Sequence, residues 1–155
     1  MITIRVTRLI HRPPHEVYAF LGWYDNDVHW RTGVLSMRQD RPGPPSVPMQ
    51  TREVMQMMGR EVVFIADVVA AEPDRRTAFR TVQGPMRAWG QRLFEPHPQG
   101  TRFTYEAHVE LPGWWKVFSP LVRVMFRQQM EKDVLRAKKS LETSASGNAQ
   151  GLPTA

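Results

Sequence analysis

MQTREVMQMMGREVVFIADVVA, residues 49–70, predicts two β-strands joined by a tight turn, because β-forming apolar residues recur on both sides of a glycine. Gly59 and Arg60 fit a two-residue hairpin of type II′, which places glycine first. Counting outward from that turn sets Arg52 opposite Asp67, an exposed ion pair worth at most about 1 kcal/mol. The hairpin therefore predicts which side chains share a face of the sheet.

One face of this hairpin is apolar along its whole second strand, and we expect that face to point inward. Its residues are Val62, Phe64, Ala66, Val68 and Ala70 on the second strand, and Met49, Thr51, Glu53, Met55 and Met57 on the first. Turn signals at residues 73–74, 84–85 and 97–100 carry the alternation through three more strands and set Arg92 opposite Tyr105. The inward residues expected on those strands are Thr77, Phe79, Thr81 and Gln83, then Met86, Ala88, Gly90, Arg92 and Phe94, and finally Phe103, Tyr105, Ala107 and Val109.

The residues before this region predict one strand and two short helices. Residues 2–11 alternate between apolar and polar side chains, which is typical of a half-buried strand. Proline is pre-organised for the first turn of a helix, so Pro14 begins a short helix that we expect to end at Gly22. A second short helical piece runs from about Asp25 toward Trp30.

Six predicted strands lie between residues 32 and 110. Their short connections require an antiparallel meander, because parallel neighbours need long crossovers. A single helix then runs from about Val117 to Leu141, and one long helix against one curved sheet is a two-layer α+β arrangement. We predict a curved seven-stranded antiparallel sheet wrapped around this helix, in one domain over residues 1–142. A disordered tail is expected over residues 143–155, which are rich in Ser, Gly, Ala and Pro.

The long helix carries two apolar stripes that are out of phase with each other. The first contains Phe118, Leu121, Val122 and Met125, and the second contains Met130, Val134, Ala137 and Leu141. Either the helix bends near Gln128 and Gln129, or its first half is enclosed more completely than its second. Gln129 lies on the first stripe, so it either points inward or is a surface residue at a bend.

Composition argues against several classes of function. The 155 residues are 41% apolar and 23% charged, which is typical of a globular domain, and no apolar run reaches the roughly 18 residues of a membrane-spanning helix. The absence of cysteine excludes disulfides, Cys-ligated zinc and thiol catalysis. The five histidines show no metal-ligand spacing, and neither a P-loop nor a Gly-x-Gly-x-x-Gly motif occurs, so we expect no metal and no cofactor.

The net charge of +6 raises the question of a nucleic-acid partner. Lys and Arg are scattered along the chain without a basic run of five residues, so we expect none. The N-terminal residues show no apolar stretch of the signal-peptide kind, which predicts a cytoplasmic location. A monomer and a homodimer both fit the sequence.

The order of these features resembles the START-like helix-grip (SRPBCC) superfamily, which includes the polyketide cyclase/dehydrase and lipid-transport families. The resemblance covers about residues 2–142 and rests on the order of the motifs rather than on any single one. The motifs are the opening strand, residues 13–21 (PPHEVYAFL), Asp25-Asn26, Trp30, Met58-Gly59-Arg60, Phe94-Glu95-Pro96, residues 100–105 (GTRFTY) and the Leu-rich terminal helix. The resemblance implies a sheet that grips the last helix and encloses a deep cavity for an apolar ligand. Because the superfamily includes binders, transporters, cyclases and hydrolases, it does not imply one activity.

A cavity of this kind would be lined by the inward face of the sheet and by the last helix. Flexible thioethers suit a wall that adapts to more than one apolar ligand, and ordinary core packing accounts for the methionines equally well. The expected ligand-binding residues are Met49, Met55, Met57, Phe64, Thr77, Phe79, Thr81, Arg92, Phe94, Phe103, Tyr105, Met125 and Gln129.

Two polar clusters fall on the inward face. One joins Glu53 with Thr81, and the other joins Thr77, Arg92 and Tyr105. An unpaired charge in an apolar cavity costs several kcal/mol, so Glu53 and Arg92 require partners. Either both are structural pairings, or Arg92 and Tyr105 hold a polar head group while Glu53 acts as an acid or base. In the second case Glu53, Arg92 and Tyr105 are the candidate catalytic residues.

Three functions fit these residues. The leading hypothesis is the binding of an apolar or aromatic small molecule, lipid- or polyketide-like, in an internal cavity. The second is a metal-independent enzyme of the cyclase or dehydratase type. The third is a lipid carrier that docks on membranes through Trp114 and Trp115, although we favour these two as a lid over the end of the cavity.

Overall fold

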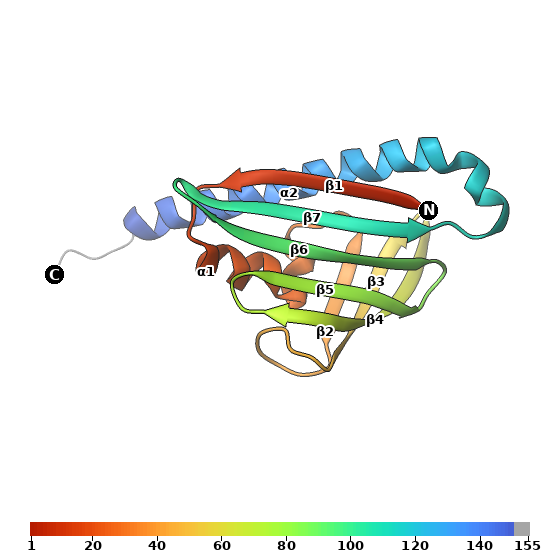
Figure 1. Cartoon of the computed structure of the whole chain (residues 1–155), viewed down its shortest axis with the longest axis horizontal. Helices are drawn as coiled ribbons and strands as arrows, with labels where there is room; N and C mark the ends of the chain where they lie inside the picture. The colour runs from red at the N-terminus through yellow and green to blue at the C-terminus, as the bar shows by residue number, and fades with distance from the viewer. Residues whose placement is uncertain (151–155) are drawn as a thin grey trace.

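The computed structural model describes the backbone of residues 1–150 and the side chains of residues 1–144. Seven strands, one long helix and several short helical segments make up this part of the chain (Figure 1). The strands are β1 (Ile2–Ile10), β2 (Val34–Gln39), β3 (Met49–Met57), β4 (Arg60–Glu72), β5 (Arg76–Gln83), β6 (Arg87–His97) and β7 (Gly100–Glu110). The helical segments are α1 (Pro14–Val17), a π-helical turn η1 (Tyr18–Gly22), the 3-10 helices η2 (Tyr24–His29) and η3 (Gly113–Phe118), and α2 (Ser119–Gln150).

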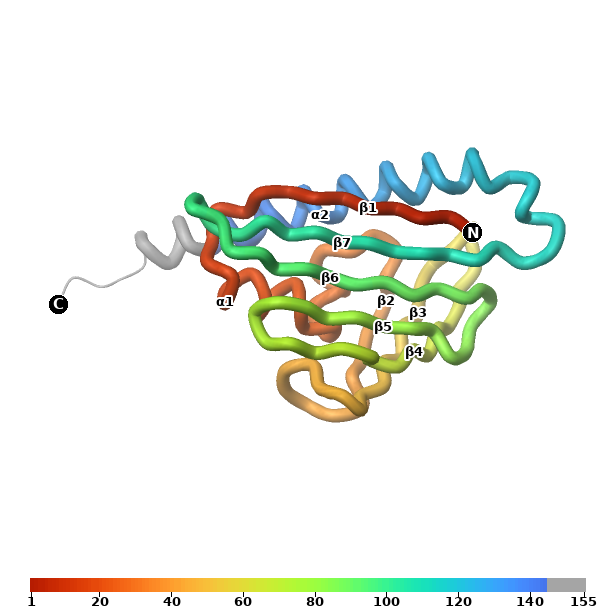
Figure 2. The backbone as a smooth tube through the Cα atoms, viewed as in Figure 1, coloured from red at the N-terminus to blue at the C-terminus, as the bar shows by residue number. Residues whose placement is uncertain are grey.

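The strands form one antiparallel sheet in the order β1-β7-β6-β5-β4-β3-β2. Strands β2 to β7 follow one another as a meander, and β1 pairs with β7, so that β1 and β2 are the two edges. The backbone trace shows the sheet curling, with β2, β3 and β4 turned steeply against β7 and β6 (Figure 2). The predicted α+β fold, with its curved seven-stranded antiparallel sheet, two short helical pieces and long last helix, is confirmed.

The helix α2 connects the two edges of the sheet. Lys138 Nζ donates a hydrogen bond of 2.6 Å to the carbonyl oxygen of Leu9 on β1. Asp133 accepts hydrogen bonds from the backbone N–H and the hydroxyl of Thr32, just before β2, at 3.1 and 2.8 Å. Val134 lies between these contacts and is fully buried. The second half of α2 therefore closes the curled sheet.

The β3–β4 hairpin differs in register from the sequence prediction. Its turn is Met58-Gly59, with φ of 50° and 77°, so Met57 pairs with Arg60. Two positive φ values define a type I′ turn, whose twist matches that of the strands, rather than the expected type II′ turn. The resulting shift of two residues keeps every side chain on its predicted face, because the period of a strand is two.

The predicted pairing of Arg52 with Asp67 is wrong for the same reason. Asp67 lies opposite Gln50, whose side-chain amide donates to it at 3.1 Å. Arg92, in contrast, lies opposite Tyr105 as predicted.

The helix α2 is longer and less enclosed than expected. It runs to Gln150 instead of ending near Leu141, so the predicted tail begins inside it, and residues 151–155 lie outside the described part of the chain. The expectation of a more enclosed first half is wrong: Leu121 is 60% exposed and Met125 58%. The helix begins past the end of the sheet and then passes along β1, as Figure 1 shows at the right.

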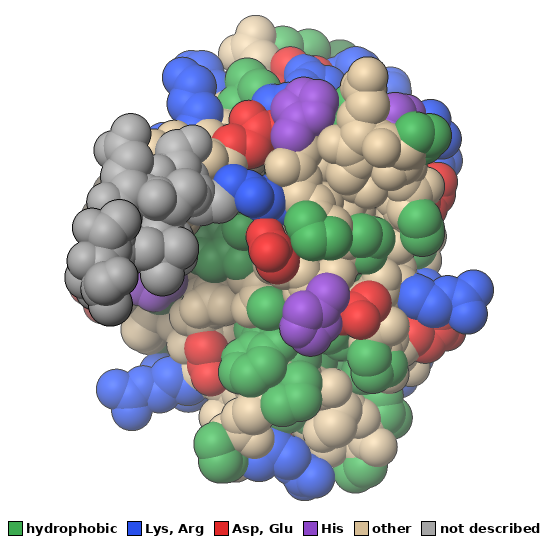
Figure 3. Space-filling model, turned by 90° about the vertical axis from the view of Figure 1, so that its left-hand side faces the viewer, with side chains coloured by type: hydrophobic (Ala, Val, Ile, Leu, Met, Phe, Trp, Pro, Cys, Tyr) green, Lys and Arg blue, Asp and Glu red, His purple; other side chains and the backbone are tan. Residues whose placement is uncertain are grey.

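The main core lies between the sheet, α1, η1 and the second half of α2. The rings of Phe94 and Phe103 pack 5.3 Å apart between centroids, and Tyr18 meets Phe94 edge-on at 5.1 Å. The segments η1 and η2 cover the inner face of the sheet at this end, which we call the closed end. Its surface carries interspersed acidic and basic side chains (Figure 3). On α1, His15 Nδ1 lies 3.4 Å from Asp74 Oδ1.

Candidate functional site

A cavity of about 470 Å³ lies between the sheet and α2, at the end of the molecule opposite the closed end. Its wall is mostly apolar, with side chains from β1, β3, β4, β5, β6, β7 and α2. Six of the nine methionines line it: Met55, Met57, Met58, Met86, Met125 and Met130. Met58 and Met125 are also largely exposed to solvent, so they mark the opening, which we call the mouth.

The structure places eight of the sequence-predicted residues on the cavity wall. Gly90, opposite Phe79, contributes to this arrangement: a Cβ there would collide with the carbonyl oxygen of Glu106 and lie 3.1 Å from the Phe79 ring. The eight residues are Glu53, Met55, Met57, Phe64, Phe79, Tyr105, Met125 and Gln129.

The other six predicted residues do not line the cavity. Phe94 and Phe103 belong to the main core, and Met49 packs in a smaller cluster with Tyr24 and Val68. Alternation predicts the face of a strand correctly, but it does not predict depth along that face. The remaining three are Thr77, Thr81 and Arg92. Thr77 and Arg92 are fully buried and lie opposite each other on β5 and β6. Thr81 Oγ1 accepts a hydrogen bond from the backbone N–H of Ala88.

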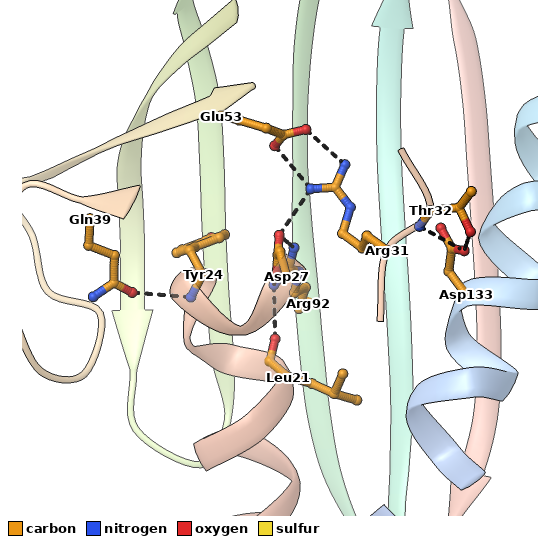
Figure 4. A network of polar contacts seen from close by, with 9 residues as sticks. All are labelled: Leu21, Tyr24, Asp27, Arg31, Thr32, Gln39, Glu53, Arg92 and Asp133. Atoms are coloured by element: carbon orange, nitrogen blue, oxygen red, sulfur yellow. Dashed lines mark hydrogen bonds and ion pairs between the residues drawn. The ribbon is translucent and has the colours of Figure 1, made fainter. Parts of the chain in front are cut away.

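Arg92 is paired with Asp27 in the interior of the closed end. Two guanidinium nitrogens donate to the Asp27 carboxylate at 2.9 and 2.7 Å, and one also donates to the carbonyl oxygen of Leu21 at 2.9 Å (Figure 4). Asp27 is fully buried, and Arg92 is 1% exposed. Breaking such a pair strands a charge away from water, so this bidentate contact fixes η2 against the sheet.

Arg31 extends this pairing to the cavity wall. Its Nη1 donates to Asp27 at 3.0 Å and to Glu53 at 3.0 Å, and its Nη2 donates to Glu53 at 3.2 Å. Figure 4 shows Arg31 lying between the two carboxylates. We call Arg92, Asp27, Arg31 and Glu53 the buried ion network. Its two cations and two anions cancel.

The electrostatics of the network follow from this pairing. Burial is the largest single influence on the pKa of Arg92 and lowers it, but the charge and hydrogen bonds of Asp27, together with the nearby tyrosines, raise the pKa above its usual value. The pKa of Arg31 is also raised, because Glu53, Tyr105 and Asp27 together outweigh the burial that opposes them. Both guanidinium groups are therefore permanently charged.

Three aromatic rings surround the Arg92 guanidinium. Its central carbon lies 4.8 Å from the ring centre of Tyr24, 5.2 Å from Trp30 and 5.0 Å from Tyr105. Burial raises the pKa of Tyr24 to about 12, although the Arg92 charge acts in the opposite direction. Arg92 is thus a structural residue of the closed end and does not reach the cavity.

The expected pairing of Glu53 with Thr81 is not found. Glu53 lies opposite Phe64 and binds Arg31, while Thr81 lies opposite Ala66. The cause is again the two-residue shift of the hairpin.

A second polar cluster connects α2 to the cavity wall. Besides its two bonds from Thr32, Asp133 accepts a hydrogen bond of 2.9 Å from Gln129 Nε2 and lies 3.6 Å from Arg136 Nη1. Gln129 therefore points inward, which was one of its two predicted placements.

Sequence reasoning missed Arg31, Asp27 and Asp133 as members of these clusters. The spacing of Asp27 and Arg31, four residues apart across a short helical piece, was a usable signal. Asp133 lies four residues after Gln129, so the inward position of one predicts that of the other.

The two tryptophans before α2 have different environments. Trp115 packs against the main core, whereas Trp114 is 67% exposed. Their rings stack at 4.8 Å, and Phe118 lies 5.9 Å from Trp114. Neither tryptophan lines the cavity, so a lid formed by both rings is not what the structure shows.

Two features are absent from the described residues. No three His, Asp or Glu side chains among them gather to hold a metal ion. No helix in the same part of the chain is long and apolar enough to cross a membrane.

Comparison with known families assigns the chain to one of them. The family model described as polyketide cyclase/dehydrase and lipid transport matches residues 1–142, and the chain belongs to this family. No curated protein matches the chain.

Solved structures with the same fold are distant in sequence. The protein TTHA0849 from Thermus thermophilus superposes with a TM-score of 0.77 at 20% identity, over 92% of this chain and 98% of that one. A START superfamily protein from Mycobacterium smegmatis gives 0.74 at 16% identity, over 92% and 99%. The Zhui aromatase/cyclase from Streptomyces sp. R1128 gives 0.69 at 12% identity, over 96% of each chain. At these identities the likeness concerns the fold alone.

Proposed function

We propose that this protein binds an apolar small molecule, lipid- or polyketide-like, in the cavity between the sheet and α2. The observation that carries the proposal is a cavity of about 470 Å³ whose wall holds six methionines together with Phe64, Phe79 and Phe126. Ligand pockets of drug-sized molecules typically measure about 300–1,000 Å³ and are mainly apolar.

The composition of the wall favours adaptable binding. Thioether side chains are unbranched and polarisable, so they adjust to ligands of different shape. The charged and amide groups of the wall are few, and four of them form two pairs. Arg31 binds Glu53, and Gln129 binds Asp133.

A cyclase or dehydratase activity has less support from the geometry. Both carboxylate oxygens of Glu53 are hydrogen-bonded to Arg31, and Arg92 lies behind the cavity wall. An acid or base must reach the proton that it transfers, and only Glu53 and Tyr105 among the candidate catalytic residues line the cavity. If the protein is such an enzyme, Glu53→Gln and Tyr105→Phe each lower turnover about 100-fold or more.

The test of the binding proposal is a fluorescence titration with an apolar naphthylamine probe. We expect saturation at one probe per chain, and loss of binding in Met55→Glu, which places a charge on the cavity wall. Val69→Glu is the matched control, because Val69 is 47% exposed on the adjacent strand β4 and does not line the cavity. If neither the probe nor a long-chain alcohol binds at micromolar concentration, the proposal is wrong.

A specific surface favours a second candidate function, that of a lipid carrier which docks on anionic membranes. Four apolar side chains are exposed just outside the mouth: Trp114, Val117, Phe118 and Leu121. The sequence between Glu110 and Glu131 contains no acidic residue, and it contains three basic ones, Lys116, Arg123 and Arg127. Indole rings and cations side by side are typical of segments that lie in a membrane interface.

Vesicle sedimentation tests the carrier hypothesis. The wild type is expected to sediment with anionic vesicles at low salt, to dissociate at high salt, and to lose binding in Trp114→Ala/Phe118→Ala. Trp89→Ala is the control, since Trp89 stacks on His108 away from this surface. A wild type that stays in solution at low salt contradicts the carrier hypothesis and leaves the binding proposal intact.

A further inference from the structure

The charges on the cavity wall are already neutralised within the protein. The charged residues that line the cavity are Arg31, Glu53 and Asp133. Arg31 binds Glu53 through both terminal nitrogens and also contacts Asp27, whose other partner is Arg92. Asp133 accepts three hydrogen bonds and pairs with Arg136 at 3.6 Å. These six groups comprise three cations and three anions.

A charged ligand would find no free counter-charge here. A carboxylate that entered the cavity would leave water and would meet Arg31 already paired with Glu53, whose side chain is 12% exposed. The neutral ion network would then carry a net charge of −1 away from water, which is strongly unfavourable. A cationic head group would meet Glu53 already paired with Arg31, and Asp133 already bonded through Oδ1 to Thr32 and Gln129.

Among the uncharged polar groups of the wall, those of Tyr105 and Gln129 lie on the inward face and can meet a ligand. The Tyr105 hydroxyl makes no hydrogen bond with another described residue, although Tyr105 is only 5% exposed and lines the cavity. Gln129 uses its Nε2 on Asp133, and its Oε1 has no partner among the described residues. A phenol can donate or accept a hydrogen bond, and an amide oxygen accepts one. Together they suit a hydroxyl or a carbonyl group.

We infer that the cavity selects an uncharged ligand, one whose apolar body ends in a hydroxyl or carbonyl group, and that Glu53 sets this selectivity by neutralising Arg31. This inference rests on the proposed binding function and deepens it. In this arrangement Glu53 is a specificity-determining residue: it excludes anionic head groups by pairing with Arg31, the one cation among the described residues that faces the cavity.

The test compares three ligands that share one alkyl chain: dodecanol, dodecanoate and dodecylamine. Each displaces the naphthylamine probe near neutral pH and below its micellar concentration. We expect the wild type to bind dodecanol at least about tenfold more tightly than either charged ligand, since tenfold is about 1.4 kcal/mol and a stranded charge costs more than that. Tyr105→Phe should weaken dodecanol binding several-fold, because it removes the hydroxyl that bonds the ligand.

Glu53→Gln provides the decisive variant. It leaves Arg31 with one carboxylate partner, Asp27, which also binds Arg92. The wall therefore gains one positive charge. Dodecanoate binding should then strengthen about tenfold while dodecanol binding stays nearly constant. Glu61→Gln is the matched control, because it makes the same change of charge on an exposed residue just beyond the Met58-Gly59 turn.

A second variant keeps the test independent of the buried ion network. Gln129→Glu adds a negative charge to the wall from α2 and should favour dodecylamine over dodecanol. If the wild type binds dodecanoate as tightly as dodecanol, or if neither variant shifts the preference in its stated direction, the inference is overturned while the binding function stands. If the probe and all three ligands fail to bind, the proposed function itself fails.

Discussion

The two ends of the curled sheet are filled in opposite ways, although the same strands run through both. At the closed end, η1 and η2 press onto the sheet and bury even charged groups, so that Arg92 is 1% exposed. Toward the mouth, the sheet and α2 enclose the cavity instead, and the first half of α2 leaves Leu121 60% exposed.

This difference separates stability from binding within one small domain. The closed end holds the contacts whose loss is costly: a bidentate ion pair, an aromatic cage and packed rings. The mouth holds side chains that contribute little to folding and that are free to meet a ligand or a surface. Mutations at the closed end should therefore lower the free energy of unfolding, whereas mutations at the mouth should change binding and leave that free energy nearly constant.

The largest effect is expected from Asp27→Asn at the closed end. The change leaves Arg92 charged and without its carboxylate partner, which lowers the free energy of unfolding by about 3–5 kcal/mol. Urea unfolding measures it. Asp40→Asn, at a half-exposed pair with Arg41, is the control and should cost less than about 1 kcal/mol. Equal losses in the two variants would remove the distinction between the ends.

A smaller effect is expected from alkaline pH acting on Tyr24. Its pKa is raised to about 12 in the folded state, so folding opposes the loss of its proton. The corresponding stability is present below pH 10 and is lost as pH rises from about 10 to 12, by about 3 kcal/mol in total. Urea unfolding at several pH values, compared with Tyr24→Phe, isolates this contribution. A Tyr24→Phe protein with the same pH dependence as the wild type would contradict it.

The smallest effect is expected at the mouth, and α2 supplies a matched pair to detect it. Leu121→Ala should change the free energy of unfolding by less than about 0.5 kcal/mol, because Leu121 is mostly exposed and alanine favours helix. Val134→Ala, on the buried half of the same helix, should cost about 1–3 kcal/mol. If Leu121→Ala costs as much as Val134→Ala, the first half of α2 is packed against something in solution.

Sequence patterns predicted the faces of the strands better than what lies against them. The hairpin register was in error by two residues, an even number, so Met55 and Met57 still faced the cavity. Phe94 and Phe103 faced inward as predicted, but their depth depends on η1 and on Tyr18, and strand alternation contains no information about either.

The partners of the buried charges were harder to predict than the need for partners. Glu53 and Arg92 required counter-charges because of where their strands place them, and both have one. Of those partners, Asp27 lies in the short 3-10 helix η2 and Arg31 lies just after it. The orientation of such a helix is decided by tertiary packing rather than by a repeating sequence pattern.

The way α2 is held has a consequence for the rate at which a ligand exchanges. The helix is fastened at Asp133 and Lys138, whereas Leu121 and Met125, in the turns before them, are more than half exposed. Widening the mouth therefore requires movement of one helical segment and no break in strand pairing. Motions of that kind occur in microseconds to milliseconds, far faster than unfolding of a sheet. Backbone amides near Leu121 should accordingly exchange with deuterium well before those near Val134.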